Sequence, residues 1–435
     1  MTNDKMEKIV SLAKRRGFIF QGSEIYGGLA GTWDYGPYGV ALKNNIKQLW
    51  WKQFVLDRED MYGLDAAILM NLKTWEASGH VGGFSDPLVE CEKCKKRFRA
   101  DHLEDKLKCP ECGGKLGEEK QFNMMFKTQI GASEDASSIS YLRPETAQGI
   151  FVNFKNVLDT MHPKLPFGIA QIGKAFRNEI APRDFIFRTR EFEQMEIEYF
   201  VHPETWKENF EALVKDTKQF FNTLGLSPEN IHELEIAKED LAHYSQRTID
   251  FEFDYPFGKK ELSGLAYRTD FDLQSHIASS GQKLEYLDQE TNQKIVPHVI
   301  EPSFGIDRLV LAILSDAFAE DEMDGEVRTY LKLAPAVAPV KVAVFPLLKN
   351  RPELQEKARE IYAKIKKEIP QTSFDDNGNV GKRYRRQDEI GTPFCITIDF
   401  DTIEKGEGVT VRYRDSGKQE RVSESDLVDF LKSRL

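Results

Sequence analysis

The chain has 435 residues, of which 40% are hydrophobic and 30% charged, and its formal net charge is −11. This composition excludes a disordered protein and favours two or three globular domains. The sequence has no apolar run long enough to span a membrane, and residues 1–16 lack the apolar segment of a secretory signal. We therefore expect a cytoplasmic protein without membrane association.

The region before residue 333 contains a mixture of helical and strand patterns. Apolar residues spaced three and four apart predict helices, and short apolar or alternating runs predict strands. Helices are expected at 4–16, 40–56, 204–224 and 305–318, and strands at 167–176, 191–201 and 250–255. Because long segments separate the strands without regular β-α alternation, the pattern favours an α+β fold with an antiparallel sheet over a doubly wound sheet.

Four of the five cysteines form two Cys-x-x-Cys pairs, Cys91 with Cys94 and Cys109 with Cys112. Each pair can direct two thiolates at one point, and together they supply the four sulfur ligands of a tetrahedral zinc site. The alternative is two disulfides, which a cytosolic setting disfavours. Since four thiolates fill the coordination shell, such a zinc site would be structural. Cys395 lies in an apolar strand pattern and is expected to be buried.

A basic hairpin is predicted around residues 176–196. Phe176-Arg-Asn-Glu179 ends one strand, and Arg188-Thr-Arg-Glu-Phe-Glu193 leads into the next. Alternation places four residues on one face of the second strand, namely Phe192, Gln194, Glu196 and Glu198, and the apolar residues between and beyond them on the core face. A face with this many charges is too costly for an ordinary core. It is either a surface hairpin laced with salt bridges or a binding site.

A second basic element favours the binding site. Glu301-Pro-Ser-Phe-Gly-Ile-Asp-Arg308 precedes the apolar run 309–313, so Arg308 would lie in the first turn of a helix. The backbone N–H groups and the dipole at a helix N-terminus favour an anion such as phosphate. The sequence has neither a P-loop nor a G-x-G-x-x-G motif after a strand. A nucleotide would therefore be held by arginines on a sheet.

The segment 333–339, with two prolines and small residues, predicts an extended linker. The strands and the helix expected beyond it form a small α/β domain, with strands at 340–347, 394–400 and 408–414 and the helix at 351–369. This domain contains a basic run, Lys382, Arg383, Arg385 and Arg386. Such a run is most often a solvated face. The negative net charge argues against a nucleic-acid partner, but a local cluster can outweigh that average.

These motifs resemble those of the class II aminoacyl-tRNA synthetases. Phe176–Glu179 is similar to their second motif, F-R-x-E, and Gly305–Arg308 to their third, G-x-x-R. The region of Pro37 and the helix after it resembles their first motif, which builds a dimer interface. Further stretches resemble the homodimeric, glycine-specific subgroup: Gly27–Pro37, Arg99–His102, Leu142–Gly149, Phe192–Glu196 and Glu301–Gly305.

The resemblance implies a class II catalytic domain at 1–333, built on an antiparallel sheet. Within it we expect a zinc-knuckle insertion at 86–120 and a helical insertion at approximately 201–250. Residues 334–339 would be the linker and 340–435 an anticodon-binding domain. The basic run at 382–386 then becomes a candidate contact for the anticodon stem, through phosphate contacts that weaken with added salt.

The implied activity is a glycine–tRNA ligase reaction, in which ATP with Mg²⁺ activates glycine as an adenylate and the glycyl group passes to the 3′ end of tRNA-Gly. The implied partners are therefore glycine, ATP, tRNA-Gly and a second copy of the chain. Because phosphoryl transfer needs positioning and charge stabilisation, planar arginine forks suit it. The residues expected around ATP are Arg177, Asn178, Glu179, Phe187, Arg188, Thr189, Arg190, Glu191, Phe192, Glu261, Leu262, Gly305, Ile306, Asp307 and Arg308.

Within that set the resemblance makes Arg177 and Arg308 the catalytic residues. Arg177 would bridge the α-phosphate and the glycine carboxylate, and Arg188 and Arg308 would hold the γ-phosphate end. Phe192 would stack on adenine, and Glu261 would coordinate Mg²⁺. The sequence offers no convincing general base for the transfer step.

Glycine has no side chain to recognise, so a tight polar pocket must exclude any larger substituent while carboxylates hold the ammonium group. The residues expected there are Arg99, Glu145, Phe192, Glu193, Gln194, Met195, Glu196, Glu301, Pro302, Ser303, Phe304 and Gly305. Three alternatives remain open at this point. They are a prolyl, threonyl or seryl enzyme of the same class, a non-catalytic RNA-binding protein with this fold, and a zinc-ribbon nucleic-acid binder with an unrelated body.

Overall fold

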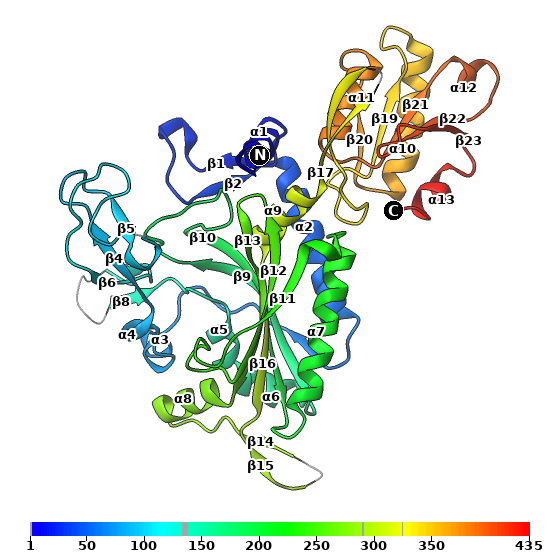
Figure 1. Cartoon of the computed structure of the whole chain (residues 1–435). Coiled ribbons are helices and arrows are strands. Elements are labelled where there is room, and N and C mark those ends of the chain that lie inside the picture. Colours follow the sequence, from blue (N-terminus) through cyan, green and yellow to red (C-terminus); the bar gives the residue numbers. More distant parts are fainter. Residues whose placement is uncertain (1, 104, 133–137, 289–290, 324) are drawn as a thin grey trace.

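The computed structural model describes residues 2–103, 105–132, 138–288, 291–323 and 325–435. A larger lobe is built around one long sheet, and a smaller lobe near the C-terminus lies beside it (Figure 1). The hairpin of β17 (Phe318–Met323) and β18 (Glu326–Leu331) lies between the two lobes. Over the described ranges, no helix is both long enough and apolar enough to cross a membrane.

The larger lobe contains a seven-stranded sheet in the order β11-β12-β13-β16-β10-β9-β3. Every neighbouring pair is antiparallel except β3 with β9. This confirms the expected antiparallel α+β fold. The strands are β3 (Met61–Gly63), β9 (Phe167–Phe176), β10 (Glu191–Val201), β11 (Ile231–Glu235), β12 (Arg247–Tyr255), β13 (Gly258–Thr269) and β16 (His298–Gly305).

One face of this sheet packs on three helices, α2 (Pro37–Trp51), α7 (Trp206–Thr223) and α9 (Ile306–Ala317). Met195 and Ile197 of β10 are fully buried in that core, as strand alternation predicts. The other face packs on α5 (Ala147–Phe151), α6 (Phe154–Met161) and α8 (Phe271–Ser280) through a second apolar cluster that contains Phe200. Neighbouring residues of β10 therefore enter two different environments.

The predicted helices and strands are found with shifts of a few residues. The first helix is α1 (Thr2–Arg15), and β9 and β10 have the predicted bounds. Helix α2 begins three residues earlier than predicted, because Pro37 fits the first helical position. It continues into a π-helical turn at Lys52–Leu56. Residues 201–250, expected to form a helical insertion with approximate bounds, contain α7 but also the edge strand β11 and the start of β12.

Short hairpins and a small three-stranded sheet surround the main sheet. The small sheet has the order β5-β4-β6 and includes the cysteine pairs in its loops. The remaining elements of this lobe are β1 (Ile19–Gln21), β2 (Trp33–Tyr35), α3 (Leu72–Ala77), α4 (His80–Gly83), β4 (Ser85–Glu90), β5 (Arg97–Arg99), β6 (Lys120–Asn123), β7 (Lys127–Gln129), β8 (Ile139–Tyr141), β14 (Tyr286–Leu287) and β15 (Lys294–Ile295), with 3-10 turns at Glu24–Tyr26, Ala100–His102 and Pro228–Asn230.

The smaller lobe is an α/β domain, as predicted. Its five-stranded sheet has the order β20-β19-β21-β22-β23, with β19 parallel to β20 and β21 and the remaining pairs antiparallel. Cys395 is 1% exposed in β21, which confirms its predicted burial. The elements are β19 (Val342–Pro346), α10 (Pro352–Glu368), β20 (Thr372–Phe374), α11 (Val380–Glu389), β21 (Phe394–Ile398), α12 (Phe400–Glu404), β22 (Val409–Tyr413), β23 (Gln419–Val422) and α13 (Leu427–Lys432).

The prediction of an extended linker at 333–339 is wrong. The backbone N–H groups of Val337 and Ala338 both donate to the carbonyl of Ala334, so the segment forms a turn. Val337 and Ala338 are fully buried in the main core. Their carbonyls accept hydrogen bonds from the Asn45 side chain of α2 at 3.1 and 3.0 Å. The turn forms because these apolar residues gain burial that an extended, solvated segment would forgo.

Buried arginines also hold the lobes together. Arg328 of β18 is fully buried and donates to Asp388 of α11 at 3.3 Å and to the carbonyl of Arg414 at 2.7 Å.

Within the predicted basic run, Arg383 is 1% exposed and donates to backbone carbonyls, and Arg386 pairs with Asp375 at 2.6 Å. The interpretation of the run as a solvated face is therefore wrong for Arg383, because its guanidinium closes a loop inside the lobe.

Candidate active site

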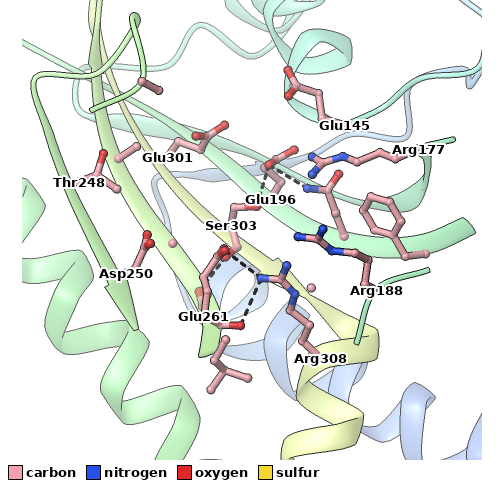
Figure 2. A pocket seen from close by; sticks show the side chains of 18 of the residues that line it. Glu145, Arg177, Arg188, Glu196, Thr248, Asp250, Glu261, Glu301, Ser303 and Arg308 are labelled. Atoms are coloured by element: carbon pink, nitrogen blue, oxygen red, sulfur yellow. Dashed lines mark hydrogen bonds and ion pairs between the residues drawn. The ribbon is translucent and has the colours of Figure 1, made fainter. Parts of the chain in front are cut away.

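A cavity of about 480 Å³ lies on the face of the large sheet that carries Gln194 and Glu196, opposite the face that packs on α2 and α7. Figure 2 shows glutamates and arginines from several elements converging on it. The lining comes from β5, β10, β12, β13 and β16, from the first turn of α9 and from loops. The charged and polar lining residues are Arg99, Glu145, Arg177, Glu179, Arg188, Thr189, Gln194, Glu196, Asp240, Tyr244, Thr248, Asp250, Glu261, Ser263, Arg268, Glu301, Ser303, Asp307 and Arg308.

The strand register brings distant parts of the sequence to one place. Glu196 on β10 lies opposite Ser303 on β16, and Ser303 lies opposite Gly264 on β13. The Ser303 hydroxyl donates to Glu196 at 2.8 Å. The sheet therefore places Glu196, Ser303 and the neighbouring Glu301 at one end of the cavity (Figure 2).

That end of the cavity is acidic and closely held. Glu196 also accepts hydrogen bonds from the backbone N–H and the hydroxyl of Thr146, at 3.1 and 2.5 Å. Glu301 accepts two from Arg268 at 2.9 and 3.0 Å. Glu145 lies 3.3 Å from the Nε2 of His80. These contacts fix the carboxylates in place before any ligand enters, and such preorganisation lowers the cost of binding.

The three carboxyl groups at this acidic end differ in the direction of their pKa shifts. Burial, together with repulsion from Glu196 and Glu145, raises the pKa of Glu301 to about 8 in spite of its contact with Arg268. Burial and the charge of Glu145 likewise raise the pKa of Glu196. Burial opposes ionisation of Glu145 as well, but His80, Arg268 and Arg177 hold its pKa below the usual range. Glu145 is therefore the carboxylate most firmly ionised at neutral pH.

Arginines line the cavity from beside the acidic end, where Arg177 lies, to its far end, where Arg308 lies (Figure 2). Arg177 follows β9, and its Nε donates to the carbonyl of Pro144 at 3.0 Å. No carboxylate lies within ion-pairing distance of Arg177 in the described part of the chain, so its outer amino groups can serve a ligand. Its guanidinium lies 5.3 Å from the ring centre of Phe192. Arg308 pairs with Glu261 at 3.0 Å, and the charge of Arg308 lowers the pKa of Glu261.

Most of the predicted site residues line this cavity. They are Arg99, Glu145, Arg177, Glu179, Phe187, Arg188, Thr189, Phe192, Gln194, Glu196, Glu261, Leu262, Glu301, Ser303, Gly305, Asp307 and Arg308. The others do not line it: Asn178, Arg190, Glu191, Glu193, Met195, Pro302, Phe304 and Ile306.

The residues outside the cavity have other contacts. Glu193 faces away from it and pairs with Lys43 and Lys47 at 2.8 and 3.1 Å. Its place in the predicted glycine pocket is corrected for that reason, since its carboxylate is already matched on the other side of β10. Met195, Phe304 and Ile306 are fully buried in the main core, and Glu191 pairs with Lys174. Arg190 donates to the carbonyls of Ala30 and Glu179 and so connects the segment after β9 to the β1–β2 loop.

Sequence reasoning missed several lining residues, among them Asp250, Thr248, Tyr244 and Arg268. Asp250 lies beside Glu261 (Figure 2), and burial together with the charge of Glu261 raises its pKa to about 7. The alternation Thr248-Ile-Asp-Phe-Glu252 could have revealed it, because the polar residues share one face of β12. Arg268 is 3% exposed and pairs with Asp272 as well as Glu301. Nothing in its local sequence marks it.

The four paired cysteines converge in the small sheet. The Sγ of Cys91 lies 3.6 Å from that of Cys112, and the Sγ of Cys94 lies 3.7 Å from that of Cys109. All four Sγ atoms lie within 4.8 Å of one another. A disulfide would bring two sulfurs to about 2 Å. A tetrahedral zinc with bonds of about 2.3 Å separates its sulfur ligands by about 3.8 Å, so this donor set fits zinc.

An antiparallel sheet that carries convergent arginines, an arginine in the first turn of the next helix and a separate α/β lobe together define a class II aminoacyl-tRNA synthetase. Residues 126–317 match the family described as tRNA synthetase class II core domain (G, H, P, S and T). Residues 341–434 match the family described as Anticodon binding domain.

Full-length relatives narrow the assignment. A glycine–tRNA ligase of Alkaliphilus oremlandii is 53% identical over 100% of this chain and 99% of that protein. Glycine–tRNA ligases of Caldanaerobacter subterraneus and Geobacillus thermodenitrificans are 51% and 52% identical, each over 99% of this chain and over 98% and 97% of their own lengths. The chain belongs to the glycine–tRNA ligase family of class II synthetases.

Proposed function

We propose that the chain activates glycine with ATP and transfers it to tRNA-Gly, and that the cavity is the site of both steps. The observation that carries the proposal is the arrangement of charge within it. An acidic end, formed by Glu145, Glu196 and Glu301, lies next to a basic region that extends from Arg177 to Arg308 (Figure 2). An amino acid with its ammonium at the acidic end would present its carboxylate toward the basic region, where triphosphate would lie.

Arg177 has the geometry of a bridging group. Its side chain extends from the end of β9 between Glu145 and the phosphate end of the cavity (Figure 2). A guanidinium with open amino groups can hold one oxygen of the glycine carboxylate and one of the α-phosphate at the same time. That alignment favours in-line attack on phosphorus, and the guanidinium stabilises the negative charge that develops there. These two effects account for most of the catalysis of phosphoryl transfer.

At the far end, Arg188 and Arg308 would hold the outer phosphates. Arg308 occupies the first turn of α9, so the helix dipole adds to its charge. Phe192 lines the cavity beside Arg177 and offers an aromatic face for the adenine ring. Asp250 and Glu261 supply adjacent carboxylates on neighbouring strands, the ligand type that Mg²⁺ prefers, and so would hold the metal that shields the phosphates.

The small sheet would hold a structural zinc through Cys91, Cys94, Cys109 and Cys112. The smaller lobe would bind the anticodon arm of the tRNA. We also propose a homodimer. The tip between β1 and β2 exposes Ile25 and Tyr26 to 87% each and Leu29 to 55%, an apolar group that a second copy could cover.

The test of the proposed function is ATP–pyrophosphate exchange measured with each amino acid in turn. Glycine should drive exchange and serine, threonine and proline should not, since Glu196, Glu301 and Ser303 close the acidic end around a small substrate. Exchange with one of those three but not with glycine would identify another synthetase of the class. Binding of tRNA without exchange for any amino acid would identify a non-catalytic RNA-binding protein.

A further inference from the structure

Three carboxyl groups lie together behind the acidic end of the cavity. One oxygen from each of Glu196, Glu198 and Glu301 lies within 4.8 Å of the other two. The side chains come from two neighbouring strands, β10 and β16. Glu198 is fully buried, Glu196 is 3% exposed and Glu301 is 8% exposed. Glu196 and Glu301 line the cavity, whereas Glu198 lies behind them. We refer to these three residues as the glutamate triad.

Hydrogen-bond donors reach the triad unequally. Glu196 accepts from Thr146, Ser303 and, at 3.5 Å, Gln194, all of which are neutral. Glu301 accepts from Arg268. Neither oxygen of Glu198 has a hydrogen-bond partner among the described residues. An ionised carboxylate with no donor in a dry interior is very costly, so Glu198 is the member that carries a proton.

The remaining two members still face a shortage of positive charge. The titratable groups around the triad are Arg268 on β13, Asp272 on α8, Arg143 after β8, Glu145 before α5 and Tyr244 before β12. Arg143 lies near Glu196 but donates to the backbone carbonyls of Lys174 and Ala66, whereas Arg268 donates to Glu301 of the triad. The Nε and one terminal amino group of Arg268 donate to Asp272, both at 2.8 Å, and its other amino group donates to Glu301. One guanidinium is thus shared by two carboxylates, with Glu196 and Glu145 still close by.

Like charges this close in a low-dielectric site do not all ionise, and they titrate as a group. Burial and the charge of Glu301 raise the pKa of Glu198 well above its usual range. Burial also raises the pKa of Glu301, to about 8, and that of Glu196. The geometry and these directions agree that the empty site at neutral pH retains more than one proton.

We propose that, in addition to the proton on Glu198, the empty site holds a second proton shared between Glu196 and Glu301, and that the ammonium group of glycine displaces this shared proton to solvent. The inference rests on the proposed function, since it takes glycine as the ligand. Glycine enters as a zwitterion, and the O–H bond of the shared proton breaks with its electron pair left on the carboxylate. The proton passes to the buffer, and no covalent bond to glycine forms.

The proton linkage has a definite sign. The glycine-bound site carries one proton fewer than the empty site, so glycine affinity rises with pH while the shared proton is present. The rise is at most about tenfold per pH unit for one proton. It levels off near pH 8, where the empty site loses the shared proton by itself. Proton release on binding should therefore be largest at lower pH and should disappear above pH 8.

Calorimetric titration of the full-length protein with glycine measures the released proton directly. At pH 7 the experiment is run in phosphate and in Tris, whose ionisation enthalpies differ. The difference in observed heat gives the number of protons, and we expect a release close to one. Glycine binding with no proton exchange at pH 7 would overturn the inference and leave the proposed function intact. Failure of glycine both to bind and to drive pyrophosphate exchange would instead overturn the proposed function.

Two variants locate the proton. Glutamine at position 198 has the shape and charge of a protonated glutamate, so Glu198→Gln should retain proton release and a glycine dissociation constant within about threefold of the parent. Loss of release in that variant would place the displaced proton on Glu198 and refute the proposed location. Glu301→Gln, titrated at saturating glycine, should lose the release. A divalent cation that metal analysis finds in the triad, and that glycine displaces, would also refute the proposal.

Discussion

Arg308, in the first turn of α9, and Glu261, on β13, form an ion pair of 3.0 Å, and Arg308 also donates to the Glu261 backbone carbonyl at 3.2 Å. The pair orients the guanidinium toward the cavity. Lysine would keep the charge but lose the planar fork, so Arg308→Lys should lower ATP–pyrophosphate exchange by about 10²-fold. Arg359→Lys, at an exposed site of the smaller lobe, is the matched control. Exchange within twofold of the parent in Arg308→Lys would contradict the assigned role.

The zinc assignment predicts that the four paired cysteines are not equivalent to the fifth. Cys109→Ser should reduce bound zinc from one equivalent per chain to almost none and should remove hydrogen-exchange protection from β4, β5 and β6, since metal binding contributes folding energy directly. Cys395→Ala should leave the zinc content unchanged. Elemental analysis and hydrogen exchange read out the two effects, and a zinc-free parent protein with a protected small sheet would refute the assignment.

Glu198 should make the stability of the protein depend on pH. The folded protein retains this proton at pH values where the unfolded chain has released it, because burial raises the pKa of Glu198. Folding is then favoured less as pH rises above the ordinary carboxyl range, by up to about 1.4 kcal/mol per pH unit. Glu198→Gln removes this dependence. The melting temperature of the variant minus that of the parent should therefore increase from pH 5 to pH 8. Glu229→Gln, an exposed control, should show no such trend; a constant difference for Glu198→Gln would contradict the prediction.

Arg328 connects the lobes, and its loss should affect tRNA charging more than glycine activation. Arg328→Met leaves Asp388 with Arg412 as its remaining partner, and breaking a buried ion pair costs about 3 kcal/mol or more. We expect a lower melting temperature and a fall in charging of at least about tenfold, with exchange per folded molecule within about threefold of the parent. Lys349→Met is the surface control. Equal losses in both reactions would show that Arg328 has no specific role in placing the lobes.

The proposed homodimer can be tested at the β1–β2 tip. Tyr26→Asp places a charge in an apolar contact and should shift the protein toward monomer in analytical ultracentrifugation. Val327→Asp, at a position that is 74% exposed in the β17–β18 hairpin, controls for the loss of an exposed apolar side chain elsewhere. A monomeric parent protein would refute the homodimer itself, and a Tyr26→Asp variant that remains dimeric would place the interface elsewhere.

Periodicity predicted the framework well because it reflects burial. The bounds of β9 and β10 were predicted from their apolar and alternating runs, and the two faces of β10 from its alternation, since each face enters a different environment. The same rule places Glu193 with Met195 on the face away from the cavity. Motif resemblance included it in the glycine pocket only because it lies beside Phe192 in sequence.

Contacts between segments that are distant in the chain could not be predicted from the sequence. Arg268 and Asp272 look like an ordinary surface pair at helical spacing, yet both are 3% exposed because β16 and α5 close over them. Likewise, the small residues and prolines of 333–339 are typical of a solvated connector, and only the apolar surface beside α2 turns them inward. In each case burial is decided by a neighbour from elsewhere in the chain.

The buried turn at Val337 and Ala338 has a consequence for how this protein can be divided. These residues fill part of the core of the larger lobe, where Asn45 of α2 binds their carbonyls. A gene fragment that stops at residue 333 would open a hole in that core and leave the Asn45 amide without its two acceptors. Such a fragment should aggregate. A fragment extended to residue 340 should not, because it keeps the buried turn with Val337 and Ala338. The connector therefore belongs to the architecture of the first lobe, and recombination or shuffling of the two halves has its natural junction after it.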